Sequence, residues 1–150
     1  MSFNTIYLAG PMEGVSVDEM NGWRRELVRL LESKTSFGSE GFSEPPPFKI
    51  LDPTRRTTFH DKPTEDFAKV IFNQDLHDID RSDICFFNMR RSGAKAWGTC
   101  MELMYAYTKG KIIIVLENAD DPPHPFIEAM NTHKVYSLKA AADIICNYLE

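Results

Sequence analysis

The sequence predicts an α/β fold with a doubly wound sheet of about five mainly parallel strands and helices on both faces. The first observation is that short apolar runs, typical of buried strands, alternate along the chain with longer amphipathic patterns typical of helices. Such alternation favours parallel strands joined by right-handed helical crossovers. The second is that the 150 residues suffice for one hydrophobic core and contain no repeat, linker or low-complexity tract. We therefore expect residues 1–150 to form a single domain.

The chain is expected to begin with a strand, a turn and a helix. Residues 4–9 are a short apolar run of strand type, and the sequence GPMEG that follows is typical of a turn. Ser16 with Glu19 three residues later is the pattern of a capping box, which predicts the start of a helix. Its apolar stripe, which includes Trp23 and Leu27, extends to about Ser33.

The remaining elements follow from the same two periodicities, separated by Gly- and Pro-rich loops. In order, we expect a strand at 48–51, a helix from about 64 to about 80, a strand at 83–88, a helix around Glu102 that ends at Lys109-Gly110, a strand at 111–116, a short helix at 126–130, a strand at 134–136 and a helix at 138–149 capped by Ser137.

Composition and charge exclude several classes of function. The net charge is -5 and the pI about 5.4, which argues against non-specific binding to nucleic-acid polymers. No apolar run approaches the length of a membrane span, and the N-terminus lacks the pattern of a signal peptide. The cysteines Cys85, Cys100 and Cys146 are odd in number and two lie in apolar segments, so we expect thiols and a cytoplasmic setting. The histidines show no metal-ligand spacing.

Two acids stand on predicted apolar helix surfaces. Glu102 is the one acid of GTCMELMYAY and should lie in about the first turn of its helix, beside the end of a strand. It could either satisfy the helix dipole or serve a ligand site. Asp75 falls in the middle of the apolar half of the preceding helix, where an acid is costly unless it is paired or used. The apolar residues predicted for that half are Phe67, Ala68, Ile71, Phe72, Leu76 and Ile79. Asp78 lies near the edge of that half. Because Asp75 and Glu102 approach one crevice, we favour a function for both.

Two loops could serve a ligand. The GPMEG corner between the first strand and helix has the form of a phosphate- or sugar-binding corner, although a plain tight turn would look the same. It is not a GxGxxG motif and has no P-loop lysine. The loop after the second strand is long for its type and carries Arg55, Arg56, His60, Asp61 and Lys62. It could be functional or a solvated excursion.

Four segments together resemble the nucleoside 2-deoxyribosyltransferase family and its deoxynucleoside 5′-monophosphate N-glycosidase relatives. They are IYLAGPMEG, NQDLHDIDRSD, GTCMELMYA and GKIIIVL, in the order and separation of that family. The resemblance implies a flavodoxin-like fold and a homo-oligomer whose active site borrows residues from a neighbouring subunit. It also implies cleavage of the bond between a base and a (deoxy)ribose, with a nucleoside or nucleotide as the substrate and no metal or organic cofactor.

The resemblance also assigns residues. Glu102 matches the family's nucleophile, and Asp75 matches the acid that holds sugar hydroxyls and orients the nucleophile. The first-strand corner, with Tyr7, Gly10, Pro11 and Met12, matches the segment that lines the site. Gly98 matches the first glycine of the loop before the nucleophile. As a carboxylate, Glu102 would form a covalent glycosyl-enzyme.

The sequence departs from the family at several positions. Met104 and Cys100 stand where glycines are usual, and Ala96-Trp97 stands where some transferases carry an aspartate that helps to protonate the leaving base. Asp78, His77 or a residue of another subunit could supply that proton. Ser92, Arg90, Arg91 and Lys95 could bind a 5′-phosphate, or they could form a solvated loop, and Glu13 stands where positive charge would help.

Two kinds of activity follow from these residues. A second base as acceptor makes a transferase, and water makes a hydrolase. A non-catalytic nucleotide-binding module of the same fold is the alternative. The base, the 5′-phosphate and the 2′-hydroxyl of the substrate stay open at this point.

Overall fold

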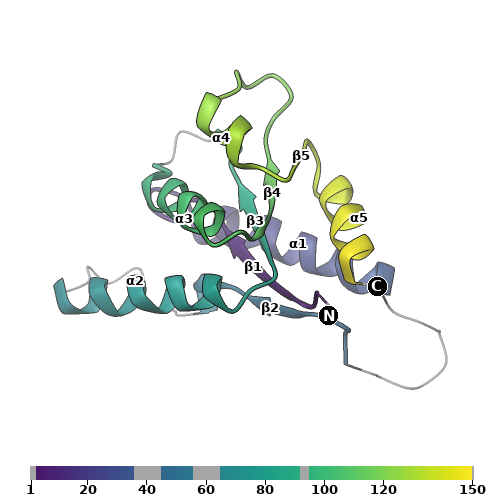
Figure 1. The fold of residues 1–150 in the computed structure, drawn as a ribbon, viewed down its shortest axis with the longest axis horizontal. Coiled ribbons are helices and arrows are strands. Elements are labelled where there is room, and N and C mark those ends of the chain that lie inside the picture. The colour runs from purple at the N-terminus through teal and green to yellow at the C-terminus, as the bar shows by residue number, and fades with distance from the viewer. Residues whose placement is uncertain (1–2, 36–44, 56–64, 92–94, 150) are drawn as a thin grey trace.

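A computed structural model of the protein describes residues 3–35, 45–55, 65–91 and 95–149 (Figure 1). Its centre is a sheet of five parallel strands in the order β2-β1-β3-β4-β5, which is the flavodoxin-like topology. The strands are β1 (Thr5–Ala9), β2 (Lys49–Leu51), β3 (Ile84–Asn88), β4 (Ile112–Leu116) and β5 (His133–Val135). The predicted α/β, doubly wound fold is therefore confirmed.

Helices cover both faces of this sheet (Figure 1). They are α1 (Val17–Thr35), the 3₁₀ turn η1 (Pro53–Arg55), α2 (Glu65–Asp80), α3 (Trp97–Thr108), α4 (Pro125–Met130) and α5 (Leu138–Leu149). One apolar core joins the sheet to α1 and α5, and a second joins its other face to α2 and α3. Strand β3 contributes side chains to both cores, because alternate side chains of a strand point to opposite faces of the sheet. Phe86 belongs to the first core and Phe87 to the second.

Local signals set the helix ends as predicted. The Ser16 hydroxyl accepts a hydrogen bond from the backbone N–H of Glu19 at 3.1 Å, and the Ser137 hydroxyl accepts one from Ala140 at 3.1 Å. Gly110 ends α3 with a φ of 67°, a left-handed conformation that favours glycine.

The predicted apolar stripe of α2 is wrong in part. Phe72 and Ala68 are exposed, whereas the buried positions are Ile71, Asp75, Asp78 and Ile79. The reason is the placement of the helix, whose first turns project beyond the sheet (Figure 1). The buried residues of α2 therefore begin at Ile71, and Ala68 and Phe72 stay exposed to solvent. Asp78, expected near the edge of the stripe, is 1% exposed.

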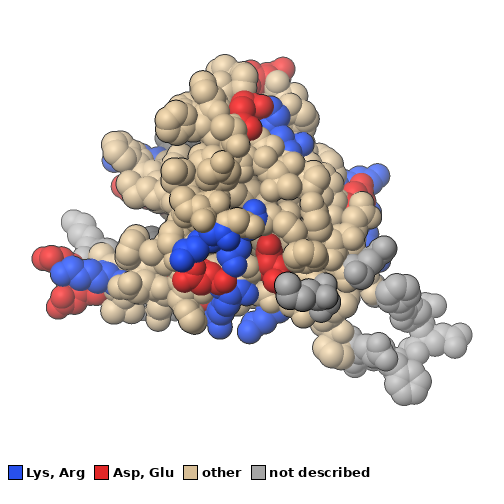
Figure 2. Space-filling view, viewed as in Figure 1, with Lys and Arg blue, Asp and Glu red and all other residues tan. Residues whose placement is uncertain are grey.

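Figure 2 shows acidic and basic side chains interspersed on one face, and the coloured residues form no broad basic area there. Among the described helices, none is both long and apolar enough to cross a membrane. All three cysteines are free, but only Cys85 is buried, and burial raises the pKa of its thiol to about 12.

Candidate active site

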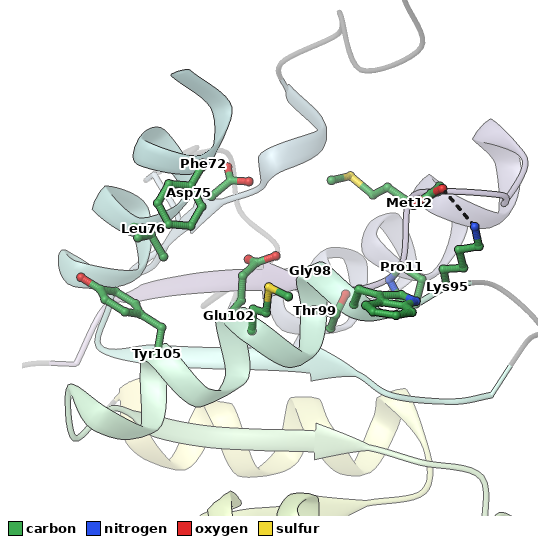
Figure 3. Close-up of a pocket in the computed structure, with 14 residues that line it drawn as sticks. Pro11, Met12, Phe72, Asp75, Leu76, Lys95, Gly98, Thr99, Glu102 and Tyr105 are labelled. Atoms are coloured by element: carbon green, nitrogen blue, oxygen red, sulfur yellow. Dashed lines mark ion pairs between the residues drawn. The ribbon is translucent and has the colours of Figure 1, made fainter. Parts of the chain in front are cut away.

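A cavity of about 380 Å³ lies between α2, α3 and the corner that follows β1 (Figure 3). It stands at the carboxyl ends of the strands, where ligand crevices of open α/β sheets are found. Its walls are mostly apolar, with a few polar groups among them. The lining residues are Gly10, Pro11, Met12, Glu13, Phe72, Asp75, Leu76, Lys95, Trp97, Gly98, Thr99, Met101, Glu102 and Tyr105.

Glu102 points into this cavity from α3 (Figure 3). The helix begins at Trp97, so Glu102 is in its second turn and farther from the positive end of the helix than the sequence suggested. The side chain is half-buried, and this burial raises the pKa of its carboxyl group to about 7. A hydrogen bond from Tyr7 opposes the rise, and the charge of Asp75 adds to it. Near neutral pH both the protonated and the ionised form of Glu102 are therefore populated.

Tyr7 lies beneath Glu102 and not in the wall of the cavity. It is the middle residue of β1, fully buried in the core that faces α2 and α3. Its hydroxyl donates a hydrogen bond to Oε2 of Glu102. Burial, reinforced by the charge of Glu102, holds the pKa of Tyr7 well above its usual value. The phenol therefore stays protonated and hydrogen-bonds Glu102, and Tyr7 reaches the cavity only through that carboxylate, although the resemblance places it in the segment that lines the site.

Asp75 faces Glu102 from the opposite wall, on α2 (Figure 3). It is 7% exposed, and its negative charge is one cause of the raised pKa of Glu102. The two acids that the sequence singled out thus share one cavity. A pair of carboxylates in an apolar pocket is an arrangement that stabilises positive charge between them.

The structure does not bring Asp78 to this cavity. Its carboxylate pairs with Arg55 at 2.6 Å and with Arg81 at 2.7 Å, which ties η1 to the end of α2. His77 is exposed on the same helix and does not line the cavity. Neither residue is placed to protonate a leaving group in the cavity of this chain.

The corner after β1 contributes Gly10, Pro11 and Met12 to the cavity, as the sequence suggested. Gly10 is required by packing, because a Cβ at this position would lie 2.7 Å from Cζ2 of Trp23 and 3.3 Å from Cβ of Asn88. Helix α1 thus supports the corner from the opposite side of the sheet.

Only some of the residues that the sequence suggested between β3 and the start of α3 line the cavity. Gly98, in the first turn of α3, and Lys95 line the cavity. Arg90 and Arg91, the other basic residues proposed for a phosphate, do not line it. Ser92 lies outside the described residues. The long loop after β2 is described only as far as Arg55, so its other four polar candidates lie outside the described part of the chain.

Sequence reasoning missed most of the cavity wall that α3 provides. Trp97, Met101 and Tyr105 follow one another at intervals of four along the helix and stand beside Glu102. A helical wheel shows that these three share one face, since residues four apart lie on the same side of a helix, and that Tyr105, three positions after Glu102, is also a neighbour of that acid. It also missed Arg24 on α1, whose side chain is 2% exposed. Its Nε lies 3.2 Å from a carboxylate oxygen of Asp52, the residue that follows β2. The charge of Arg24 helps to lower the pKa of Glu102.

The described residues offer no group of three or more His, Cys, Asp or Glu side chains that could hold a metal ion. What the cavity does offer is a carboxylate that can attack, a tyrosine that fixes it and a second carboxylate opposite. Such a set suits nucleophilic catalysis at a carbon that develops positive charge.

Comparison with known structures gives the same fold. The 2-deoxyribosyltransferase of Bacillus psychrosaccharolyticus is similar with a TM-score of 0.70 and 16% identity, over 93% of this chain and 90% of that chain. A conserved protein from Enterococcus faecalis V583 has a TM-score of 0.68 and 17% identity, over 97% of this chain and 99% of that chain. The CMP N-glycosidase of Clostridium botulinum has a TM-score of 0.57 and 14% identity, over 97% of this chain and 100% of that chain. No protein with a curated description matches the sequence.

The family comparison covers most of the chain. Residues 4–119 match the family described as "Nucleoside 2-deoxyribosyltransferase like". The match extends from the strand that holds Tyr7 to the loop after β4 and includes every residue that lines the cavity. The protein therefore belongs to the nucleoside 2-deoxyribosyltransferase-like family.

Proposed function

We propose that this protein cleaves the N-glycosidic bond of a 2′-deoxynucleoside or its 5′-monophosphate through a covalent glycosyl-glutamate intermediate. The sugar then passes to another base or to water. One observation carries the proposal: Glu102 faces a cavity of about 380 Å³, held by Tyr7 from below and opposed by Asp75.

The first step forms one bond and breaks another. A carboxylate oxygen of Glu102 attacks C1′ of the sugar, the C1′–N bond breaks, and its electron pair goes to the base, which takes up a proton. The transition state resembles an oxocarbenium ion, so the negative charges of Glu102 and Asp75 stabilise it. The hydrogen bond from Tyr7 fixes the attacking carboxylate and favours its ionised form.

The second step releases the enzyme. A nitrogen of a second base or the oxygen of water attacks C1′, loses a proton, and Glu102 departs as a carboxylate. Two displacements at the same carbon give net retention of configuration, as in retaining glycosidases. The walls suit the substrate, because aromatic side chains such as Phe72 and Tyr105 can stack on a base while Asp75 accepts hydrogen bonds from sugar hydroxyls.

A non-catalytic nucleotide-binding module is the alternative, and the departures from the family pattern at Met104 and Ala96 motivate it. Neither residue lines the cavity, so these departures do not occupy the space that a substrate would take.

The proposal includes a homo-oligomer. Its support is the exposed apolar surface of α3, where Trp97, Met101, Met104 and Tyr107 are 71%, 65%, 50% and 51% exposed. Light scattering of the purified protein would show whether it is larger than a monomer.

Chromatography tests the activity. The protein is incubated with deoxynucleosides and their 5′-monophosphates, with and without a second free base, beside the Glu102→Ala variant. A Glu26→Ala variant, which removes from α1 a carboxylate that lies outside the cavity and pairs with Arg29, is the matched control. We expect free base or a new nucleoside from the wild type and the control, and neither from Glu102→Ala. Ligand binding without any product would support the binding module instead.

A further inference from the structure

We infer that the cavity selects 2′-deoxynucleosides over their 5′-monophosphates, and that Glu13 sets this selection. The inference rests on the proposed function and narrows its substrate class. It follows from the charges that line the cavity and from the positions of the cations around it.

The cavity is acidic. Glu13, Asp75 and Glu102 line it, and Lys95 is the one cation among its described lining residues. The ammonium group of Lys95 lies 3.8 Å from a carboxylate oxygen of Glu13, so its charge is already balanced at the mouth (Figure 3). A phosphomonoester carries a charge of about -1.5 to -2 at neutral pH. Placing it here would add like charge to a cavity whose lining is already net negative.

Neighbouring arginines of the described chain are held elsewhere. The Nε of Arg90 donates to Oδ1 of Asn88 at 3.1 Å, and Arg90 lines a separate cavity near the start of α1. The guanidinium of Arg91 donates to the carbonyl of Pro122 at 2.9 Å. Arg55 is paired with Asp78. Bidentate arginine contacts are a strong means of holding a phosphate, and each of these three guanidinium groups is directed to a partner outside the cavity lining.

A neutral 5′-hydroxyl meets none of this repulsion. It can donate a hydrogen bond to a carboxylate such as Glu13 and accept one from Lys95, since a hydroxyl is both donor and acceptor. The same mouth that disfavours a phosphate therefore suits an unmodified nucleoside. Replacing Glu13 by Gln should free Lys95 to meet a phosphate and should weaken the selection.

The experiment compares kcat/KM for one deoxynucleoside and its 5′-monophosphate in four proteins. They are the wild type, Glu13→Gln, Glu13→Gln/Lys95→Gln, and Glu26→Gln as a control for net charge. We expect the wild type to favour the nucleoside by about tenfold or more, and Glu13→Gln to reduce that ratio about five- to tenfold, the scale of one charge near a protein surface. The double variant should lose the change, and Glu26→Gln should keep the wild-type ratio.

Binding of the same two ligands, measured by calorimetry, separates the inferred selection for the nucleoside from the proposed catalytic function. Preferred turnover of the monophosphate by the wild type would overturn this inference and leave the proposed function intact. An unchanged ratio in Glu13→Gln would overturn the role of Glu13. Tighter binding of the nucleoside without base release would overturn the proposed function and support the selection. If neither ligand binds, both claims are wrong.

Discussion

The phenol of Tyr7, in the middle of β1, donates a hydrogen bond to the carboxylate of Glu102, which lies 95 positions later on α3. The bond joins the centre of the sheet to the wall of the cavity. It holds the group that we propose as the nucleophile and favours its ionised form, although burial pushes the pKa of that group up to about 7. The balance between these two influences makes the proposed reaction sensitive to pH.

Tyr7→Phe should shift this balance toward the protonated acid. Because the lost hydrogen bond lowers the pKa of Glu102, the acid limb of kcat/KM should move to higher pH, and activity at pH 7 should fall about 10- to 100-fold. For the wild type we expect activity to rise through about pH 7, since the carboxylate is the attacking form, and this profile is the reference. A pH–rate profile with an unmoved acid limb would contradict this account.

Asp75→Asn should shift the acid limb the other way. The charge of Asp75 raises the pKa of Glu102, so the variant should ionise Glu102 at lower pH. The maximal rate should nevertheless fall by about 10²-fold or more, because the charge opposite the oxocarbenium-like carbon is lost. The paired shifts, upward in Tyr7→Phe and downward in Asp75→Asn, are measured in the same series of buffers. Movement in the same direction would rule out this electrostatic account.

Arg24→Gln should affect both stability and titration. The buried guanidinium pairs with Asp52 and lies over the ring of Trp23, with its carbon 4.3 Å from the ring centroid. Breaking a buried pair costs about 3 kcal/mol, which urea denaturation would detect. The acid limb should also move to higher pH, since the charge of Arg24 lowers the pKa of Glu102. Arg25→Gln, at the exposed neighbouring position, should do neither.

Gly10→Ala should destabilise the protein by about 1–3 kcal/mol, because its Cβ would lie 2.7 Å from Trp23 and the ring is held in the core. Gly22→Ala is the matched control. A Cβ at position 22, inside α1, meets nothing within 4 Å, and alanine there should stabilise by about 0.5–1 kcal/mol. Equal unfolding free energies for the two variants would show that Gly10 is not constrained by packing.

The fold could be predicted from the sequence because its signals are local. Ser16, Ser137 and Gly110 mark helix ends through contacts within a few residues, and the strands are short, nearly continuous apolar runs. Periodicity alone did not predict which side chains of α2 are buried. Periodicity placed Phe72 inside and Asp78 near the edge, but the position of the helix relative to the sheet determines which turns are covered.

The candidate site could be predicted where a residue type stood out or where the family resemblance marked a segment, as at the corner after β1. Glu102 and Asp75 were found because an acid on an apolar helix face is unusual. The pairing of Tyr7 with Glu102 could not be seen, since it depends on how β1 and α3 meet in space. The same holds for Arg90 and Arg91, whose place in the sequence beside the cavity loop says nothing about the partners that hold them away from it.

The most direct test of the central claim is to find the covalent intermediate. The protein is mixed with a deoxynucleoside, quenched in acid within one turnover, digested and examined by mass spectrometry. We predict a deoxyribosyl group on the peptide that contains Glu102, and its absence in Glu102→Gln. Base release by the wild type with no adduct, together with undiminished release by Glu102→Gln, would contradict the account.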